Sequence, residues 1–244
     1  MTNPRIEGAE NITKPAISLF FPAHNEESNI GRAIESAVLV LDEITSDYEI
    51  IIIDDGSTDA TREIVSALAE SNHRIRLILH PENRGYGGAL ISGFSAAKLP
   101  WVFFTDGDNQ FDLHEINRLL PYRDSADLII GYRIDRKDHP IRRLNAFGWR
   151  MLIWLLLGVN IRDVDCAFKL IRREVLESID LTALGAVISA ELLAKSKNKG
   201  FRIKEIGVSH FPRTSGAPSG GNLSVILKAF KELFQLKARL KAEK

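Results

Sequence analysis

Short hydrophobic runs alternate with helix-like stretches along most of the chain. The runs have the length of β-strands and cover residues 17–21, 48–53, 75–79, 101–105, 128–131, 168–171 and 201–210. The stretches with helical character cover residues 30–41, 64–68, 87–97, 142–159, 183–195 and 223–240. This alternation predicts βαβ units and a mostly parallel sheet.

The run at 48–53 is almost purely isoleucine, as expected of a strand that is covered on both faces. We therefore predict a single α/β domain over residues 15–212, in which helices flank a mostly parallel central sheet. Residues 213–244 follow it as a glycine-rich loop and a basic amphipathic C-terminal helix.

The composition is that of a folded globular domain and argues against nucleic-acid-binding, disulfide-linked and cysteine-zinc proteins. Of the 244 residues, 45% are hydrophobic and 26% are charged, which is the balance of a folded globular domain. Lys plus Arg equal Asp plus Glu at 32 each, so no basic field suggests nucleic acid as a partner. Cys166 is the single cysteine, which excludes an internal disulfide and a cysteine-based zinc cluster.

The sequence carries no signal for export or for crossing a membrane. Residues 1–14 lack the apolar centre of a secretory signal. The most hydrophobic stretch, 151–159, is nine residues long, whereas a bilayer crossing needs about 20. We expect a cytoplasmic protein, and we keep open a peripheral contact with the cytoplasmic face of the membrane.

That contact would involve the C-terminal helix. From Lys228 onward the chain has six basic residues against two glutamates, and the apolar positions form a broad face. A basic amphipathic helix can lie on an anionic membrane. It can equally pack on its own domain or on a second subunit of a homo-oligomer. Trp149 and Trp154, in the neighbouring apolar stretch, favour the membrane.

Acidic residues follow two of the predicted strands, which we expect to be adjacent in the sheet. They are Asp54-Asp55 and Asp59 after one strand, and Asp106-Gly107-Asp108 after the other. In open α/β sheets the ligand binds beyond the carboxyl ends of the strands. Each cluster alone could be a turn or a helix cap, but two together favour a functional site.

The second cluster has the spacing of a metal site. Residues two apart in an extended segment point the same way, so Asp106 and Asp108 can aim at one point. Gly107 leaves room for a diphosphate, and Gln110 can add an amide oxygen. Oxygen ligands of this kind suit Mg²⁺ or Mn²⁺, which bridge carboxylates to phosphates.

Three segments in this order resemble the motifs of family 2 glycosyltransferases, which have the GT-A fold, a Rossmann-like single domain. They are Pro-Ala-His-Asn-Glu at 22–26, Asp-Asp-Gly-Ser-Thr-Asp at 54–59 and Asp-Gly-Asp-Asn-Gln at 106–110. The resemblance runs from about 17 to 211. It is greatest to the dolichol-phosphate mannosyltransferase-like branch, which glycosylates polyprenyl phosphates.

The resemblance implies a nucleotide-sugar site for a UDP- or GDP-sugar. The implied donor-binding residues are Pro22, His24, Glu26, Ile53, Asp55, Arg84, Asp106, Gly107, Asp108 and Arg213. The implied ligands of the Mg²⁺ or Mn²⁺ ion are Asp106, Asp108 and Gln110. For Arg84, an exposed glycine-rich turn is an equally good interpretation.

On the acceptor side, Arg133, Arg142 and Arg143 match the part of this branch that receives the lipid phosphate. Arginine suits this task because its planar fork binds phosphate through two hydrogen bonds, although a solvated charged loop is the alternative. Asp163 and Asp165 match a segment near the reacting sugar, so with Arg133 they are the implied catalytic residues. For a hydroxyl acceptor one aspartate would be the general base, whereas an ionised phosphate needs none.

The C-terminal part departs from the branch. After Gly216 the dolichol branch has a Ser-Lys pair, whereas this chain has Pro-Ser-Gly-Gly at 218–221. The donor and the acceptor therefore stay open. We expect a metal-dependent, inverting hexosyltransferase that acts on a polyprenyl phosphate in cell-envelope synthesis. The alternatives are transfer to a saccharide or other hydroxyl, and a non-catalytic nucleotide-sugar-binding partner subunit.

Overall fold

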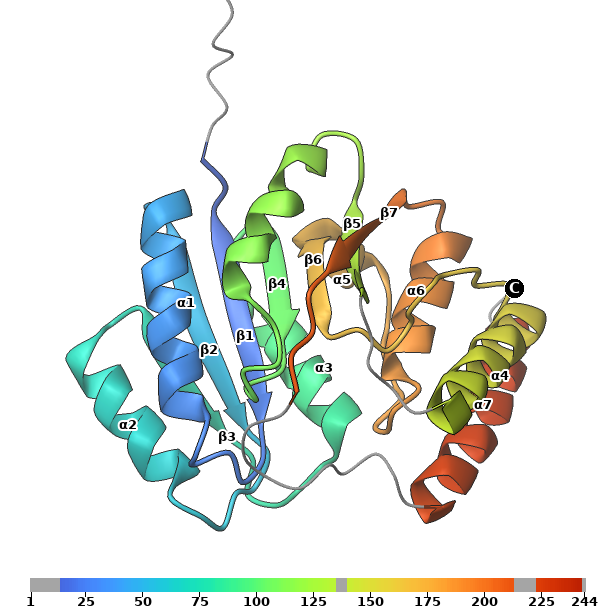
Figure 1. Ribbon diagram of the computed structural model, residues 1–244, viewed down its shortest axis with the longest axis horizontal. Helices are drawn as coiled ribbons and strands as arrows, with labels where there is room; N and C mark the ends of the chain where they lie inside the picture. Colours follow the sequence, from blue (N-terminus) through green and yellow to red (C-terminus); the bar gives the residue numbers. More distant parts are fainter. Residues whose placement is uncertain (1–13, 135–139, 213–222, 243–244) are drawn as a thin grey trace, which may run out of the picture.

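The computed structural model describes residues 14–134, 140–212 and 223–242, with the backbone alone at 140–145 and 223–228. A seven-stranded sheet in the order β3-β2-β1-β4-β6-β5-β7 forms its centre (Figure 1). The strands are β1 (Ile17–Ala23), β2 (Tyr48–Asp54), β3 (Ile75–Leu79), β4 (Trp101–Thr105), β5 (Leu128–Arg133), β6 (Phe168–Arg172) and β7 (Ile203–Val208). Of these described strands, β6 alone runs antiparallel to its neighbours. The predicted α/β domain with a mostly parallel sheet is confirmed.

Helices cover both faces of the sheet. The helices are α1 (Ile30–Ile44), α2 (Thr61–Ser71), α3 (Tyr86–Ala96), α4 (Pro140–Leu157), α5 (Arg173–Ser178), α6 (Ile188–Asn198) and α7 (Leu223–Ala242), with 3₁₀ turns η1 (Leu113–Arg118) and η2 (Leu120–Tyr122). One core joins the sheet to α1, α2 and η1, and the other joins it to α3, α4, α6 and α7. Alternate residues of β2 enter opposite cores, which explains why its isoleucines are continuous.

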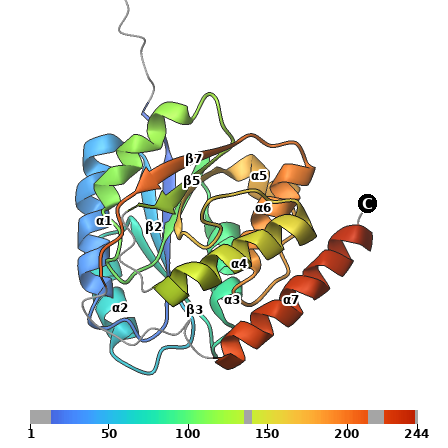
Figure 2. The ribbon, with the colours of Figure 1, turned by 45° about the vertical axis from the view of Figure 1, so that its right-hand side comes forward.

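The C-terminal helix packs on its own domain. Leu233 and Leu236 are fully buried, and α7 lies beside α4, where the rings of Trp149 and Phe230 meet edge to face at 5.6 Å (Figure 2). Among the alternatives for this helix, packing within the domain is therefore realised. Phe230 and Phe234 nevertheless keep 39% and 55% of their surface exposed.

Two expectations about the arrangement are wrong. The strands that carry the acidic clusters are not adjacent, because β1 lies between β2 and β4. The chain leaves β1 toward β2 and β3, then returns to place β4 on the other side. This reversal is the switch point at which open α/β sheets bind ligands. The two acidic clusters therefore flank the segment at 22–26.

The helix predicted over 183–195 begins only at Ile188. The buried carboxylate of Glu191 accepts hydrogen bonds from the backbone N–H groups of Thr182 and Ala183, at 3.0 and 2.7 Å. These bonds hold residues 182–187 as a loop. The loop packs against the start of α3, where Gly87 donates its N–H to the carbonyl of Leu184 at 2.9 Å.

The close approach of this loop requires glycine at position 87. A β-carbon there would lie 2.1 Å from the carbonyl oxygen of Ala183. We expect Gly87→Ala to lower the free energy of unfolding by about 1–3 kcal/mol, because backbone has to move. The control is Gly148→Ala in α4, where no atom lies within 4 Å of the added carbon. It should raise stability by about 0.5–1 kcal/mol. Urea denaturation measures both, and a loss of stability in both variants would contradict this account.

Candidate active site

The first two motifs lie together at the carboxyl edge of the sheet. Nδ1 of His24 is 3.0 Å from the carbonyl oxygen of Asp55. The N–H of Asn25 donates to Oγ of Ser57 at 3.0 Å, and the N–H of Glu26 donates to Oγ1 of Thr61 at 2.8 Å. The segments after β1 and β2 thus form one hydrogen-bonded unit, as a shared nucleotide pocket requires.

Asp55 holds the loop in front of α3. Its Oδ1 accepts the N–H of Arg84 at 2.9 Å and lies 2.6 Å from Nδ1 of His80, and its Oδ2 accepts the N–H of Gly85 at 2.9 Å. His80 is buried, and its Nε2 lies 2.8 Å from Oγ of Ser92. The carboxylate is thus occupied by internal contacts, whereas the Arg84 side chain is exposed.

Sequence reasoning missed His80. The strand pattern could have indicated it, because His80 directly follows β3, which runs parallel to β2 and therefore ends at the same edge of the sheet. Its N–H donates to the carbonyl of Asp54 at 2.9 Å.

The loop that Asp55 holds leads to the metal-site candidate. Gly85, in the left-handed region at φ 86°, is followed by Tyr86, the first residue of α3. The Tyr86 hydroxyl donates to Oδ1 of Asp106 at 3.1 Å. Burial and the Asp106 carboxylate raise the pKa of Tyr86 well above its ordinary value, so the phenol remains a donor. Tyr86 was also missed by the sequence reasoning.

Asp106, Asp108 and Gln110 lie at the end of β4, as predicted. Asp108 is 7% exposed, and its Oδ1 accepts the N–H of Gln110 at 3.1 Å. The Gln110 amide donates to the carbonyl of Phe211 at 2.8 Å, and the N–H of Phe211 donates back to the carbonyl of Gln110 at 2.8 Å. The segment after β7 is thereby fastened beside this site. Arg213, the predicted diphosphate ligand, lies outside the described residues.

The charges of this site are suited to a cation. Burial and the neighbouring Asp108 raise the pKa of Asp106 to about 7, so the two carboxylates resist being ionised together. In the described part of the chain, no group of three or more His, Cys, Asp or Glu residues could hold a metal. A cation here would have Asp106 and Asp108 as acidic ligands. Gln110, water and phosphate oxygens would complete its shell.

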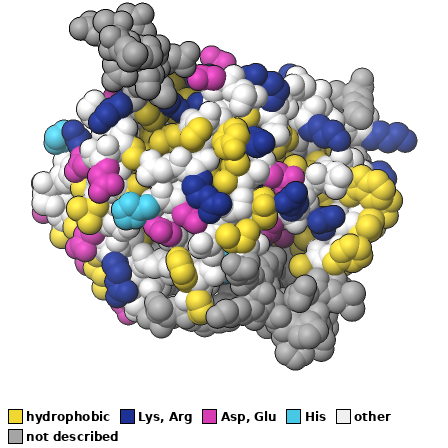
Figure 3. Space-filling model, turned by 45° about the horizontal axis from the view of Figure 1, so that its top comes forward, with side chains coloured by type: hydrophobic (Ala, Val, Ile, Leu, Met, Phe, Trp, Pro, Cys, Tyr) yellow, Lys and Arg dark blue, Asp and Glu magenta, His cyan; other side chains and the backbone are white. Residues whose placement is uncertain are grey.

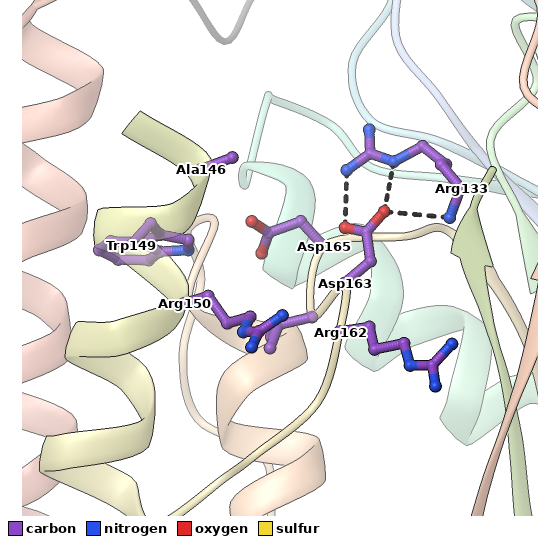
Figure 4. A pocket seen from close by; sticks show the side chains of 8 residues that line it. Arg133, Ala146, Trp149, Arg150, Arg162, Asp163 and Asp165 are labelled. Carbon is purple, nitrogen blue, oxygen red and sulfur yellow. Dashed lines mark hydrogen bonds and ion pairs between the residues drawn. The ribbon is translucent and has the colours of Figure 1, made fainter. Parts of the chain in front are cut away.

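Arg133 and Asp163 form an ion pair at the end of β5. Nε of Arg133 donates to Oδ2 of Asp163 at 2.7 Å and Nη2 donates to Oδ1 at 2.8 Å, a bidentate geometry (Figure 4). The backbone N–H of Arg133 adds a contact of 3.3 Å to Oδ2. Two residues that the sequence placed separately in the acceptor site are thus each other's partners.

Asp165 points away from this pair. Figure 4 shows its carboxylate directed toward α4, where Ala146 and Trp149 lie. Burial and the charge of Asp163 raise the pKa of Asp165, while the charges of Lys169 and Arg133 lower it. A small pocket of about 80 Å³ lies here, and its lining includes Arg133, Trp149, Arg150, Arg162, Asp163 and Asp165.

The sequence reasoning missed Arg150 and Arg162, which come from separate elements and carry no motif. The side chains of Arg142 and Arg143 lie outside the described residues. In the described residues, the predicted acceptor region corresponds to a pocket whose lining includes three arginines and two aspartates; the guanidinium of one of them, Arg162, lies over the Tyr132 ring at 4.7 Å.

Comparison with known proteins places this geometry in a family. Residues 18–180 match the model of glycosyl transferase family 2. The chain is 28% identical over 227 residues to dodecaprenyl-phosphate galacturonate synthase of Rhizobium johnstonii, covering 90% of this chain and 65% of that protein. It is 28% identical over 188 residues to dolichyl-phosphate beta-glucosyltransferase of Dictyostelium discoideum, covering 69% and 58%. The chain thus spans less than two thirds of either relative.

A solved structure supports the fold. The crystal structure of glucosyl-3-phosphoglycerate synthase from Mycobacterium tuberculosis, in complex with Mn²⁺ and UDP-glucose, superposes with a TM-score of 0.72. The match covers 92% of this chain and 79% of that one at 20% identity. The chain therefore has the GT-A fold.

The raised pKa of Asp106 predicts a pH-dependent stability. Its pKa is about 7 in the folded protein against 3.8 ordinarily, so folding binds a proton between these values. In EDTA, stability should fall as the pH rises from about 4 to about 7. Asp106→Asn should remove this term, and its melting temperature should exceed that of the wild type more at pH 8 than at pH 5. For a chain of this size, each kcal/mol corresponds to about 2–4 °C.

Mn²⁺ together with UDP should stabilise the wild type more at pH 8 than at pH 5, because the cation displaces the proton. Asp112→Asn is the control, since Asp112 lies in the same segment but keeps 45% of its side-chain surface exposed. Differential scanning fluorimetry measures all three proteins. An Asp106→Asn profile that is parallel to the wild type at every pH would contradict this account.

Proposed function

The chain belongs to glycosyl transferase family 2, and from this premise we propose that it transfers a hexose from a nucleoside diphosphate sugar to a polyprenyl phosphate, with inversion at the anomeric carbon. The observation that carries the proposal is the juxtaposition of two charged sites at one edge of the sheet. The Asp106–Asp108 pair would serve the donor, and the arginine-lined pocket around Arg133 would serve the acceptor.

On the donor side, the segments after β1 and β2 would enclose the nucleoside, with Pro22, His24 and Glu26 as contacts. Asp55 would act through the loop that it holds, and the Ile53 side chain is fully buried in the core. Asp106, Asp108 and Gln110 would hold Mg²⁺ or Mn²⁺. When bound, the cation neutralises the charge that develops on the departing diphosphate. A structure of the same fold was solved with Mn²⁺ and UDP-glucose, which supports this assignment.

On the acceptor side, the phosphate would enter the pocket beside Arg133. Arg133 uses Nε and Nη2 for Asp163, so Nη1, with Arg150, is the positive charge we assign to the phosphate, whereas the Arg162 guanidinium lies over the Tyr132 ring at 4.7 Å. A phosphate oxygen attacks the anomeric carbon while the bond from that carbon to the diphosphate breaks. Because the phosphate is already ionised at neutral pH, no base is required.

The two aspartates would then have different roles, a question that the sequence left open. Asp163 is held in the ion pair with Arg133, which suits it to orient the guanidinium rather than to accept a proton. Asp165 faces the pocket, which suits it to contact the sugar (Figure 4). The names of the relatives include dodecaprenyl-phosphate and dolichyl-phosphate activities, which supports the lipid acceptor over a hydroxyl acceptor or a non-catalytic subunit.

The α4 and α7 surface would bring the enzyme to its acceptor. Within the described residues no helix has the length and hydrophobicity needed to cross a bilayer. Large hydrophobic side chains are nevertheless exposed on both helices: Phe147, Trp154, Leu155, Phe230 and Phe234. Figure 3 shows hydrophobic side chains on the side of the molecule where these helices lie, with Lys and Arg beside them. We assign this surface to an anionic membrane at its cytoplasmic face.

The acceptor assignment predicts a selective defect in Arg133→Ala. The kcat/KM for undecaprenyl phosphate should fall roughly 30- to 900-fold, because a desolvated charged contact is lost. This corresponds to about 2–4 kcal/mol of transition-state stabilisation. Binding of the nucleotide sugar should be unchanged. Asp165→Asn should reduce the rate without removing a basic limb from its pH profile. If a hydroxyl is the true acceptor, Asp165→Asn or Asp163→Asn should be inactive at every pH and Arg133→Ala nearly silent.

Two controls separate binding from folding. Arg133→Ala leaves the Asp163 carboxylate buried without its guanidinium, so Arg133→Ala/Asp163→Ala removes that charge as well. Recovered activity in the double variant would show that Arg133 only neutralises Asp163, against the proposal. The matched control is Arg202→Ala, which breaks the bidentate pair with Asp127 at the opposite edge of the sheet, where Arg202 contacts Asp127 at 2.9 and 3.1 Å. It should keep full acceptor use.

The membrane assignment predicts that Phe147→Asp/Leu155→Asp weakens binding to phosphatidylglycerol vesicles by about tenfold or more, since two apolar contacts become charged. Both side chains are more than half exposed, so the fold should be retained. Leu39→Asp is the control, because Leu39 is 66% exposed on α1, across the sheet. Vesicle co-sedimentation measures all three, and equal losses in both variants would place the contact elsewhere.

A further inference from the structure

A lysine lies buried in the middle of the sheet. Lys169 belongs to β6, where it pairs with Phe104 of β4 and Ile130 of β5. Its exposure is 0%, and it is among the largest fully buried side chains of the protein. Its two register partners belong to the hydrophobic core between the sheet and α3, α4, α6 and α7. An aliphatic side chain is the ordinary occupant of such a position.

The Lys169 ammonium is bound by the turn that carries Asp165. Nζ donates to the carbonyl of Val164 at 3.1 Å and to the carbonyl of Cys166. These are the residues on either side of Asp165. Nζ also lies 5.3 Å from the centre of the Phe104 ring. Among the described residues, no carboxylate oxygen lies within ion-pair distance of it, so its direct partners are two carbonyls and a ring.

A contribution to stability does not explain why a lysine occupies this buried position. Burying an ammonium without a close counter-ion costs several kcal/mol, and burial lowers the pKa of Lys169 accordingly. Methionine has a similar length and would fill the same space without a charge. Two carbonyl bonds and one cation–π contact offset only part of the desolvation. The site itself offers a better reason for the charge.

We propose that Lys169 is a positioning residue, which fastens the turn at 164–166 from inside the core so that the Asp165 carboxylate faces the acceptor pocket. This inference rests on the proposed function, in which Asp165 contacts the reacting sugar. By binding the carbonyls of Val164 and Cys166, the ammonium fixes the peptide units between residues 164 and 165 and between residues 166 and 167, and so restrains Asp165 between them. Its charge also favours the ionised form of Asp165.

Besides Lys169 on β6, charged and titratable groups from several elements surround Asp165, among them Tyr86 at the start of α3. Arg133 lies at the end of β5, Asp163 and Arg162 lie in the same loop, and Arg150 extends from α4 (Figure 4). Asp163 raises the pKa of Asp165, and Lys169 and Arg133 lower it. Removal of Lys169 leaves Asp163 opposed by the arginines alone. The Asp165 carboxyl should then titrate at a higher pH.

The test is Lys169→Met, assayed in two independent ways. The first is kinetic: kcat with undecaprenyl phosphate should fall about 10- to 100-fold, because a carboxylate near the reacting carbon is misplaced. The KM for the nucleotide sugar should change much less than kcat, since Lys169 acts on the proposed metal ligand Asp106 only through its charge. The acidic limb of the kcat profile should move to higher pH.

The second readout does not depend on activity. The Trp149 side chain lines the same pocket as Asp165, so the ¹H–¹⁵N resonance of its indole, assigned with Trp149→Phe, reports the titration of that nearby carboxyl. In Lys169→Met the midpoint should move to higher pH. An unchanged midpoint would overturn the proposal even if the wild type transferred no sugar. A wild type inactive toward every acceptor, with a shifted midpoint in the variant, would instead overturn the proposed function alone.

Lys195→Met is the matched control. Lys195 is also a buried lysine, and its Nζ donates to the carbonyl of Asp180 at 2.6 Å, away from the pocket. It should change stability but neither the kcat profile nor the indole titration. If Lys169→Met behaves like this control, Lys169 is only structural. If Lys169→Met does not fold, Lys169→Gln replaces it, because glutamine keeps a hydrogen-bond donor for one carbonyl but has no charge. In Lys169→Gln the titration midpoint of Asp165 must still move to higher pH.

Discussion

Negative charge held at the edge of a hydrophobic sheet is the constraint on which this structure depends. A carboxylate at low dielectric needs positive charge or hydrogen-bond donors close by. Asp55 receives two backbone N–H groups, and Asp163 receives a guanidinium in bidentate geometry. Asp106 accepts a hydrogen bond from the Tyr86 phenol. That bond does not offset the burial of Asp106 and the negative charge of Asp108, so the pKa of Asp106 rises to about 7. That imbalance distinguishes Asp106 from Asp55 and Asp163, each of which has its donors close by.

These interactions also determine the shape of the edge. Asp55 positions the loop in front of α3, and through it Tyr86 beside Asp106. On the proposed acceptor side, the antiparallel strand β6 determines where the functional residues lie. Because β6 is antiparallel to β4, Phe168 at its start lies opposite Thr105 at the end of β4. The loop before β6, with Asp163 and Asp165, is thereby brought to the edge that carries the donor motifs. The proposed donor and acceptor sites lie at one edge because β6 runs antiparallel to its neighbours.

The sequence by itself determined the elements and the donor motifs of this protein. Each of the seven strands overlaps a hydrophobic run, and the match is clearest for β2 and β4, because a strand covered on both faces is apolar over its own length. The Asp106, Asp108 and Gln110 spacing placed these residues together because they are neighbours in the chain. For the same reason the resemblance to the family was readable from short segments. Local patterns were sufficient wherever the physical cause was local.

Only the tertiary structure decided which distant side chains are partners. The Arg133–Asp163 pair joins residues of two separate segments, and the contacts of Asp55 with His80 and the α3 loop require β2 and β3 to be in register. The insertion of β1 between the acidic strand ends, and the direction of β6, follow from the crossovers of the sheet. The Lys169 side chain reaches the carbonyls around Asp165 because the strand and its preceding turn fold back on each other. Such contacts depend on strand order and register, which no local pattern of residues encodes.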